Sequence, residues 1–573
     1  MGSFKREIAR KYKINIPKNS ELLKIYHETF AKKRGGIYPF PLLEILLRKR
    51  PVRSLSGVVN VSVLTKPYPC PGKCIFCPSQ KNIPKSYLAG EPAVQRAIRN
   101  KFNPRKQVEM RLAALQATGH PIDKVELRII GGTWSYYPKP YQERFIRQCF
   151  LACNNFNTSQ NPKSEIRNSK QIQNSKNQNL KKEQVKNEGA KCRIVGIAVE
   201  TRPDFITPTE IKQMRKLGIT KVELGVQSIY NDVLKQNQRG HNVEKTIEAT
   251  RLLKNAGFKV SYQIMPGLLG SNPKKDLAMF QEIFFNPNFK PDYLKIYPLA
   301  LIKNTKLYKI YQQKKFKPYT KKQLSKLLIE VKKQIPYWCR VERIIRDIPS
   351  SDIVEGGSNV LNLREIIAKE MKKGGQVCRC IRCREVSSDY NAKEKIYLFR
   401  EDYEASGGKE VFLSFENKTR TKLYALLRLR LVKEPSSRQR RELGSIQNPA
   451  LIRDLHTYGQ MAQINGAQGS VSAQHKGLGK KLLAEAEKIT KQNGFSKIAV
   501  ISGVGVRPYY RKLGYRLQNT YMVKNVVARS ARELCSLETS RFLTLALRAR
   551  CFPTRGNTQF PPVLGFFTPK VFG

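Results

Sequence analysis

Three cysteines close together in the sequence are the strongest chemical signal in the chain. Cys70, Cys74 and Cys77 are spaced C-x3-C-x2-C in the segment YPCPGKCIFCPSQ. Thiolates at this spacing can ligate three irons of a 4Fe–4S cluster and leave the fourth iron open. The open iron can bind the amino and carboxylate groups of S-adenosylmethionine (SAM), whose reductive cleavage gives a 5′-deoxyadenosyl radical. A zinc knuckle is the alternative, but zinc needs a fourth ligand nearby, and the next cysteine is Cys149.

Polar residues at the ends of the following strand-like segments support the cluster interpretation. A GGT turn follows VELRII, an ETRPD segment ends the next apolar run, and ELGVQS ends another. Each alone is typical of an ordinary turn or a surface ion pair, but several at successive strand ends indicate a shared pocket. The residues predicted to contact SAM are Gly131, Gly132, Thr133, Glu200, Arg202, Glu223 and Gln227.

A glycine-rich turn before a helix predicts an acyl-CoA site. Its glycines let the backbone approach a pyrophosphate, and the amides at the start of the helix bind the negative charge. Tyr509 and Tyr510, in YYRKLGY, are candidates to contact the thioester or to protonate the leaving thiolate, with core packing as the alternative for either. The predicted acyl-CoA residues are Gln474, His475, Lys476, Gly477, Leu478, Gly479 and Lys480.

A second cysteine triplet has a different spacing and suggests a different metal. Cys378, Cys380 and Cys383 form C-x-C-x2-C, which favours a structural zinc that needs one more ligand. We expect His456 to be that ligand, although a lone histidine is often only a core residue. A further iron–sulfur cluster is the alternative for the three cysteines.

The charge balance indicates a polyanionic partner. The chain has 106 Lys and Arg residues against 44 Asp and Glu, a net charge of +62. Such an excess favours nucleic acid, because phosphates offset the repulsion between the positive charges. A lysine-rich composition bias is the alternative. Without a signal peptide or a long apolar run we expect no membrane association, and cysteines grouped at metal spacing indicate a reducing, cytoplasmic location.

Short apolar segments alternate with amphipathic helical segments through the first half of the chain. Nearly all-apolar strands that alternate with helices are typical of a parallel sheet in an α/β fold. The six predicted strands favour a partial or full (βα) barrel, with its chemistry on the loops after the strands. The strand segments are 58–64, 125–132, 194–200, 221–228, 258–267 and 293–299, with helices at 207–218 and 243–257.

The rest of the chain has a different character. Residues 154–190, rich in Asn, Gln and Lys, predict a disordered surface insertion, with an RNA-binding arm as the alternative. Residues 411–417 and 423–432 predict antiparallel strands, and 497–502 predict a later strand.

In their order these motifs resemble the Elp3 family, the catalytic subunits of Elongator. The first cysteine loop is similar to the radical SAM signature, and the turn, helix, strand and YYRKLGY order resembles the GNAT acetyltransferase fold. Further matching segments include YLAGEPAVQRAIRNKFNP, ETRPD, VELGVQSIYNDVL, RIIRDIPSSDIVEGGSNVLNLRE, CRCIRCRE, LHTYG and QHKGLGKKLL. The resemblance runs from about Arg34 to Lys524 and places His456 with the second cysteine triplet in the family's zinc motif.

The resemblance implies a radical SAM partial (βα) barrel followed by a GNAT-type α+β domain. It implies carboxymethylation of tRNA uridine(34): the deoxyadenosyl radical abstracts a hydrogen from the acetyl methyl of acetyl-CoA, the carbon radical adds to uridine C5, and the thioester is hydrolysed. The implied cofactors are a 4Fe–4S cluster, SAM, acetyl-CoA and structural Zn²⁺. The implied partners are the tRNA anticodon loop and an external electron donor, with other Elongator-type subunits left open. The predicted RNA contacts are Arg53, Arg96, Arg99, Lys101 and Arg105.

Five parts of the chain follow from these assignments. They are a basic helical tRNA-binding segment (1–55), a radical SAM domain (56–375, with the 154–190 insertion), a zinc-binding linker (376–410), an acetyltransferase domain (411–524) and a tail without an assigned role (525–573).

Three other functions compete with this one. A protein lysine acetyltransferase of the histone type would need neither SAM nor tRNA. An RNA-binding scaffold would use the cluster only structurally and release no deoxyadenosine. A radical SAM tRNA methylthiotransferase would have no use for a CoA-binding module.

Overall fold

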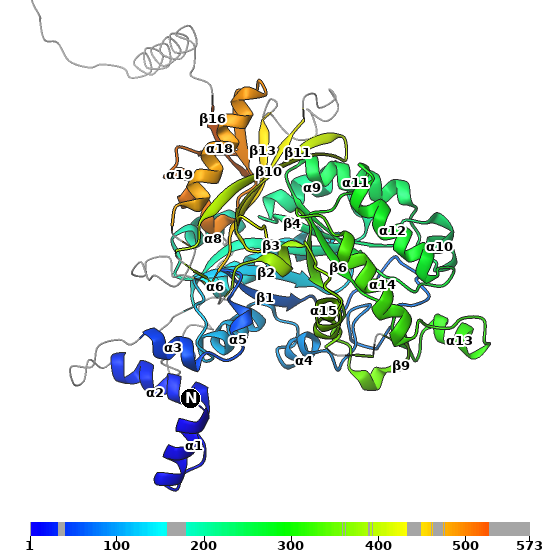
Figure 1. The fold of residues 1–573 in the computed structure, drawn as a ribbon, viewed down its shortest axis with the longest axis horizontal. Helices are drawn as coiled ribbons and strands as arrows, with labels where there is room; N and C mark the ends of the chain where they lie inside the picture. The colour runs from blue at the N-terminus through cyan, green and yellow to red at the C-terminus, as the bar shows by residue number, and fades with distance from the viewer. Residues whose placement is uncertain are drawn as a thin grey trace, which may run out of the picture. The chain divides into compact units, whose positions relative to one another are not determined.

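Seven parallel strands form the sheet that carries the first cysteine loop. In a computed structural model of the chain they are ordered β1-β2-β3-β4-β5-β6-β8, and all six pairings are parallel. Within the described residues β1 does not pair with β8, so the sheet is an open half-barrel (Figure 1). The model describes residues 2–31, 41–156, 179–357, 359–360, 362–387, 390–391, 393–432, 449–459, 461, 474 and 476–526. The strands are β1 (Val59–Leu64), β2 (Lys124–Ile130), β3 (Arg193–Thr201), β4 (Lys221–Gln227), β5 (Lys259–Ile264), β6 (Tyr293–Ile296) and β8 (Arg340–Arg343).

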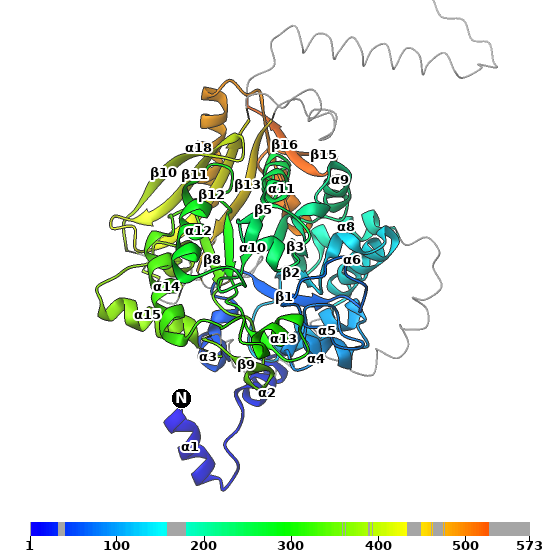
Figure 2. The same ribbon diagram turned by 90° about the vertical axis from the view of Figure 1, so that its right-hand side faces the viewer.

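Helices cover the outer side of this sheet (Figures 1 and 2). Strand residues alternate between the two faces. On β4, for example, Val222 and Leu224 join the apolar core, whereas Lys221 and Glu223 form ion pairs. The helices of this region are α4 (Pro92–Arg99), α5 (Pro104–Gln116), α6 (Lys139–Asn154), α8 (Leu180–Gly189), α9 (Pro208–Lys216), α10 (Asn231–Gln236), α11 (Val243–Asn255), α12 (Pro273–Phe285), α13 (Lys306–Gln312), α14 (Lys321–Gln334) and α15 (Leu363–Lys373).

The six predicted strands are confirmed to within a few residues, but the last strand of the half-barrel escaped sequence analysis. Strand β8 has the sequence RVER, which is too short and too charged to show an apolar pattern. It is a strand because β6 lies beside it, with Tyr293 paired to Arg340 and Leu294 to Val341. A small ribbon of β7 (Leu301–Ile302) and β9 (Ile353–Glu355) was missed for the same reason.

The predicted disordered insertion at 154–190 is wrong at both ends. Asn154 is the last residue of α6, and residues 180–189 form α8. Helix α8 shows no apolar pattern, and the side chain of Asn187 within it is fully buried. This side chain accepts a hydrogen bond from the Ile194 amide at 2.8 Å and donates one to the Cys192 carbonyl at 3.1 Å. A polar helix is therefore held by tertiary hydrogen bonds. Residues 157–178 lie outside the described part of the chain.

A second sheet follows, ordered β10-β11-β12-β13-β14-β16-β15. Its pairings are antiparallel except for β13 with β14, which are parallel over Ala450–Ile452 only. This is the predicted α+β domain, but it begins within the predicted 376–410 linker, because β10 already pairs along its whole length with β11. The elements are α16 (Ile381–Arg384), β10 (Ile396–Ala405), β11 (Gly408–Asn417), β12 (Leu423–Leu431), β13 (Ala450–Thr457), α18 (Leu478–Gln492), β14 (Lys497–Val500), α19 (Arg507–Arg511), β15 (Arg516–Gln518) and β16 (Tyr521–Asn525).

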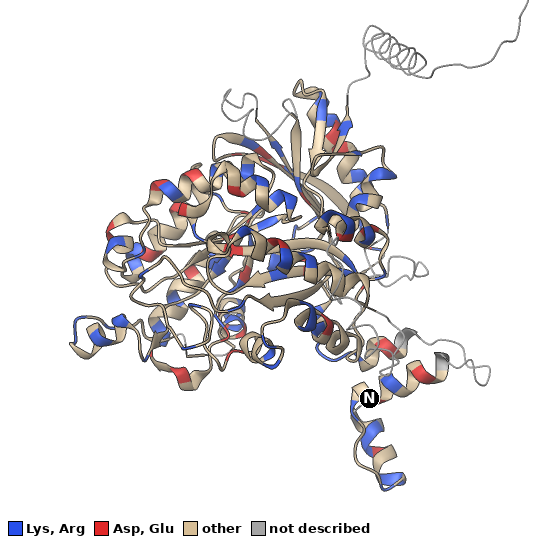
Figure 3. Ribbon diagram, turned by 180° about the vertical axis from the view of Figure 1, so that it is seen from behind, with Lys and Arg blue, Asp and Glu red and all other residues tan. Residues whose placement is uncertain are grey.

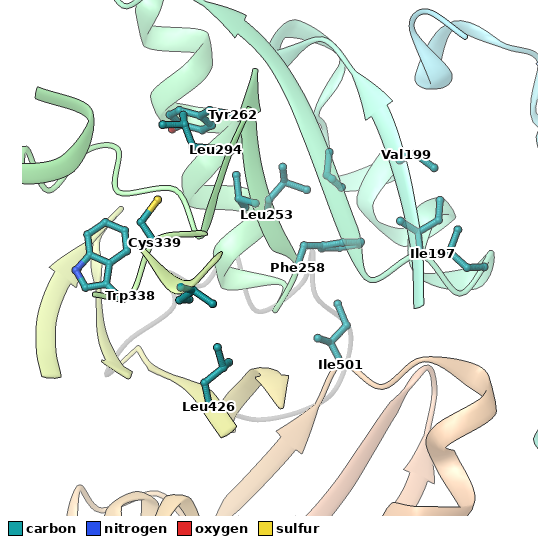
Figure 4. Packing of buried hydrophobic residues seen from close by; sticks show 14 of the residues in the cluster. Ile197, Val199, Leu253, Phe258, Tyr262, Leu294, Trp338, Cys339, Leu426 and Ile501 are labelled. Atoms are coloured by element: carbon teal, nitrogen blue, oxygen red, sulfur yellow. The ribbon is translucent and has the colours of Figure 1, made fainter. Parts of the chain in front are cut away.

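The second sheet packs against the barrel through apolar and charged residues together. Figure 4 shows Ile501, which follows β14, near Phe258 and Ile197 of the barrel. Between the two regions Arg453 of β13 donates to Asp292, which precedes β6, at 2.8 and 2.5 Å, and both side chains are fully buried. Buried charges that cross the boundary in this way fix one relative position of the two sheets, because each needs the other as its partner.

The N-terminal region is helical, as predicted, with α1 (Gly2–Lys11), α2 (Asn19–Ala31) and α3 (Pro41–Leu47). Figure 1 shows these helices at one side of the half-barrel, next to α5. No helix among the described residues is long and apolar enough to cross a membrane. The predicted tail, from Val527 onward, lies outside the described residues.

Candidate active site

The first cysteine loop lies beyond the carboxyl end of β1 and meets residues from two other strand ends. A Cβ built on Gly72 would lie 3.6 Å from Cys70 Sγ and 3.7 Å from Cys74 Sγ, so the loop folds its thiols around this glycine. The three sulfurs do not all fall within 4.8 Å of one another, unlike those of the second triplet. Wider spacing is expected where three thiolates bind three different irons of a cluster rather than one ion.

The glycine turn after β2 reaches this loop. Gly131 and Gly132 have φ values of +129° and +100°, which favour glycine, and a Cβ on Gly131 would lie 2.1 Å from Thr65 Oγ1. Thr133 Oγ1 is 3.9 Å from Cys70 Sγ. The structure therefore brings this turn and the cysteine loop together, as expected for a shared pocket.

Three buried polar atoms beside the loop lack hydrogen-bond partners among the described residues. They are Arg202 Nη1, Gln227 Oε1 and Arg239 Nε. Arg202 keeps its other nitrogens on Asp204, at 2.9 and 2.8 Å, and its Nη1 would lie 2.6 Å from a Cβ on Gly72. Buried donors and acceptors are normally satisfied. This set therefore fits a polar ligand such as the amino-acid end of SAM, with the three thiols fitting its cluster.

Arg239 is a site residue that sequence analysis missed. Its Nη1 lies 3.5 Å from Cys74 Sγ, and it follows α10 in the segment NQRGHN, where no spacing marks it as functional. Gln227, which was predicted, sits at the end of β4 with φ +72°, an uncommon backbone conformation for a residue with a side chain. Such strain is frequent at binding sites.

The side chains of two predicted SAM contacts are already bound to other residues. Glu200 accepts hydrogen bonds from Tyr87 at 2.8 Å and from Gln263 at 3.1 Å. Glu223 is fully buried deeper in the barrel, where Arg128 and the lysines of an adjoining ion network surround it. Burial alone would raise the pKa of Glu223, but these positive charges lower it well below the ordinary value. The structure thus pairs Glu223 with Arg128, Lys221 and Lys295 in the barrel interior.

The predicted acyl-CoA turn stands at the start of α18. Gly477 caps the helix with φ +80°. The backbone amides of the first turn of a helix have no carbonyl partner within the helix and can therefore bind an anion. Gln474 crosses to the barrel: its amide nitrogen donates to the Thr457 carbonyl at 3.0 Å, and its oxygen accepts from Lys124 at 3.0 Å. His475 lies outside the described residues, and Lys476 lies 5.4 Å from the ring centre of Tyr390.

The two predicted tyrosines lie next to this turn. A Cβ on Gly479 would be 3.1 Å from the Tyr509 hydroxyl, and the rings of Tyr509 and Tyr510 are 5.3 Å apart. Burial raises the pKa of both phenols, so near neutral pH they keep their protons and can supply a proton but not remove one. Tyr509 is half-buried and Tyr510 is buried in the core.

A cavity of about 870 Å³ joins the acyl-CoA turn to the interior of the half-barrel. Its lining includes the turn, Lys480 and Tyr509 on one hand, and residues of the barrel strands, among them Arg128 and Glu342, on the other. The volume falls within the range of small-molecule sites. The acyl-CoA turn and the barrel strands therefore border one common space.

Comparison with known proteins agrees with this arrangement. Residues 68–283 match the radical SAM superfamily, and residues 291–373 match the radical SAM C-terminal domain. A tRNA uridine(34) acetyltransferase of Methanocaldococcus infernus is 45% identical over 91% of this chain and 94% of its own length. The chain belongs to the Elp3 family. It is accordingly a radical SAM enzyme of the Elp3 type.

Two further relatives extend the comparison. Human Elongator complex protein 3 is 38% identical over 83% of this chain and 86% of its own length. The solved structure of the Methanocaldococcus infernus Elp3 with residues 1–46 deleted matches with a TM-score of 0.69 at 42% identity, covering 82% of this chain and all of that one.

The second cysteine triplet of this Elp3-family chain is compact. The sulfurs of Cys378, Cys380 and Cys383 all lie within 4.8 Å of one another, and Lys332 Nζ is 3.6 Å from Cys383 Sγ. His456 is not in this group. It lies on β13 opposite Leu426, and its Nε2 donates to the Ser56 carbonyl at 2.7 Å. The expectation that His456 completes the triplet is therefore wrong, because its position on β13 places it in the lining of the cavity between the two sheets, which we call the interdomain cavity.

Four of the predicted RNA contacts lie on or between α4 and α5, and Arg53 lies in a 3-10 turn before β1; Figure 3 marks the Lys and Arg residues along the ribbon. Arg99 and Lys101 are exposed, while Arg105 is paired with Glu109 at 2.6 Å. Arg53 and Arg96 lie close to Arg111, which sequence analysis missed. Burial and the charges of Arg53 and Arg96 lower the pKa of Arg111 to about 10. Guanidinium groups that repel one another in this way form a suitable site for a phosphate.

Proposed function

We propose that this protein modifies uridine 34 of tRNA, adding to its C5 a carboxymethyl group that derives from acetyl-CoA. The observation that carries the proposal is the cavity that joins the acyl-CoA turn to the radical SAM half-barrel. The relatives support the substrate, since the archaeal ones are tRNA uridine(34) acetyltransferases. The net charge of +62 suits an RNA partner.

Each part of the molecule then has a defined role. Cys70, Cys74 and Cys77 would hold a 4Fe–4S cluster, and Arg202 and Gln227 would bind SAM through their unpartnered polar atoms. Once bound, these groups supply a 5′-deoxyadenosyl radical that removes a hydrogen atom from the acetyl methyl. An external donor provides the electron. The radical formed at the acetyl methyl carbon adds to uridine C5. The adduct then passes one electron to an external acceptor and loses the C5 hydrogen as a proton, and hydrolysis of the thioester leaves the carboxymethyl group.

The chain's own residues hold and orient the acyl donor. The amides at the start of α18 bind the CoA pyrophosphate, and Tyr509 can donate a proton to the departing thiolate, because its raised pKa keeps it protonated. The half-barrel excludes water from the radical, whose reactivity would otherwise be lost. Arg53, Arg96 and Arg111 bind the tRNA backbone and bring the anticodon loop to the cavity. We further propose that the second cysteine triplet binds a structural zinc ion.

Anaerobic reconstitution tests the function. The purified chain is supplied with iron, sulfide, SAM, a reductant, acetyl-CoA and tRNA, and the tRNA nucleosides are analysed by mass spectrometry. We expect 5-carboxymethyluridine, and its loss in Cys70→Ala. An intact cluster that cleaves SAM without forming this nucleoside would contradict the proposal. Acetyl-lysine formed without tRNA would favour the protein acetyltransferase instead.

A further inference from the structure

The barrel wall of the interdomain cavity carries two charged side chains that the assigned roles do not use. Arg128 of β2 and Glu342 of β8 both line the cavity, as do Gly479 of the acyl-CoA turn and Tyr509. Both side chains are largely buried, with 16% of Arg128 and 19% of Glu342 exposed. A buried charged group needs hydrogen-bond partners for all of its polar atoms. Arg128 and Glu342 each have a polar atom with a partner and a buried polar atom without one among the described residues.

Arg128 is held firmly at one end. Its Nη2 donates to both carboxylate oxygens of Glu223, at 3.2 and 3.4 Å. Its Nε is buried and has no hydrogen-bond partner among the described residues. Because Glu223 also pairs with Lys295, the guanidinium is fixed from behind by a fully buried ion network.

Glu342 is held in the corresponding way. Its Oε1 accepts a hydrogen bond from Lys221 at 2.5 Å, and Lys221 is itself fixed 3.8 Å from Glu223 and 4.2 Å from the ring centre of Tyr293. Its Oε2 is buried without a hydrogen-bond partner in the described part of the chain. The two side chains that line the cavity thus carry one buried unpaired donor and one buried unpaired acceptor, joined through the same network.

Native proteins rarely leave buried polar atoms unpaired, and the exceptions are frequent at reactive sites. A thioester hydrolase needs this combination: a donor for the acyl oxygen, whose charge grows during attack, and an acceptor for the proton of the attacking water. The carboxymethyl product requires such a hydrolysis, and no residue assigned above activates the attacking water. Tyr509 and Tyr510 cannot, because they keep their protons.

The other carboxylates of the cavity wall are less suited. Asp454 accepts a hydrogen bond from Tyr293 at 2.7 Å and lies between Lys259 and Arg428, at 3.7 and 3.6 Å. Glu126 lies two residues before Arg128 on β2 and has no cation that fixes its carboxylate in an ion pair among the described residues. Glu342 alone combines a fixed position with an unpaired oxygen.

We propose that Arg128 and Glu342 form the thioester-hydrolysis site of this enzyme, Arg128 binding the acyl oxygen and Glu342 accepting a proton from water. The inference rests on the proposed function. The water oxygen bonds to the acyl carbon, and the carbon–sulfur bond breaks. CoA leaves as a thiolate that Tyr509 protonates, and Tyr509 regains a proton from solvent. The acyl group becomes a carboxylate beside Arg128, and both protons of the water, one of them taken up first by Glu342, are released to solvent. The ligand class is therefore an acyl thioester of CoA.

The test uses the full chain, reconstituted anaerobically with SAM, acetyl-CoA and tRNA. CoA release is followed with a thiol reagent, deoxyadenosine by chromatography and the tRNA by mass spectrometry. In Glu342→Gln we expect CoA release to fall by about 100-fold or more, whereas deoxyadenosine still forms. The tRNA should then carry uridine still linked to CoA through the thioester. Glu342→Asp, which keeps a carboxylate, should restore part of the CoA release.

Matched variants separate this role from others. Glu330→Gln, an exposed carboxylate on α14 paired with Lys333, should leave CoA release unchanged. The proposal is overturned if Glu342→Gln releases CoA nearly as fast as the natural chain, or if Glu126→Gln alone stops the release. It is also overturned if the Gln and Asp variants lose CoA release and deoxyadenosine together, which would make Glu342 a structural residue. If the natural chain forms deoxyadenosine but no modified uridine, the proposed function fails instead.

Discussion

The ion network between the two sheets allows one stability effect to be worked out in detail. Asp292 is fully buried, accepts two hydrogen bonds from Arg453 and one from the Val260 amide, and lies 3.7 Å from Lys254 and 3.6 Å from Arg428. Burial alone would raise the pKa of Asp292, but these cations lower it far below the ordinary value. The carboxylate is therefore charged at every ordinary pH and is the common partner of three cations.

Asp292→Asn keeps the shape of the side chain and removes the charge. Breaking a buried ion pair by removing one partner typically costs about 3–5 kcal/mol, because the remaining charge is left buried and unpaired. A domain is stable by only about 5–15 kcal/mol in total. Urea unfolding followed by tryptophan fluorescence measures the change, since Trp338 lies at this boundary, where its carbonyl accepts a hydrogen bond from Arg428 at 2.7 Å.

Asp232→Asn is the matched control. Asp232 also pairs with a lysine, Lys275 at 2.6 Å, but 58% of its side chain is exposed. Exposed ion pairs contribute roughly 0–1 kcal/mol, so this variant should unfold almost as the natural chain does. The reasoning is refuted if the two variants lose similar amounts of stability, or if Asp292→Asn loses less than about 1 kcal/mol.

Three further predictions concern the same interface and the two metal and ligand sites. Burial lowers the pKa of Lys254 from its ordinary 10.5 to about 8. Between pH 8 and 10.5 the unfolded chain therefore binds more protons than the folded one, and the free energy of unfolding of the natural chain should rise by about 3 kcal/mol relative to that of Lys254→Met. A difference between the two free energies of unfolding that stays constant across this pH range would contradict the prediction. Cys378→Ser should lower the zinc content from about one ion per chain, measured by elemental analysis, and an unchanged content would show that the triplet binds none. Gly477→Ala should lower the free energy of unfolding by about 1–2 kcal/mol through its φ of +80° alone, since no atom lies within 4 Å of the added Cβ. It should also weaken acetyl-CoA binding measured by calorimetry, and an equal affinity would argue against the turn as the CoA site.

Much of the barrel could be predicted because its signals are local. Each buried parallel strand is an almost continuous apolar run, and the cysteine loop, the glycine turn and the Q-x-x-G-x-G turn each lie within a few residues of one another. Strand β8 and helix α8 could not be predicted in this way. Their residues are polar, and they are ordered by partners far along the chain, as α8 is by Asn154, which accepts a hydrogen bond from Asn187, and by Arg507, which pairs with Glu188.

The residues of the candidate site likewise fall into those that the sequence marks and those that only the tertiary structure brings together. Spacing alone marks Cys70, Cys74 and Cys77, but nothing in the spacing marks Arg239, Arg111 or Glu342, which become relevant only because other strands and helices place them. His456 shows the opposite error. It was assigned to the second triplet by motif, yet the pairing of β13 with β12 directs it to the cavity.

The sequence by itself therefore determined the types of chemistry available: a thiolate triplet for a cluster, a glycine turn for CoA and a positive charge for RNA. These depend on residue type and short spacing, which the chain states directly. The tertiary structure alone decided how they are connected. Residues 161 positions apart, Asp292 and Arg453, fix the second sheet against the barrel, because a buried charge is stable only beside its partner. That fixed position creates the cavity that the predicted acyl-CoA turn and the barrel strands line together.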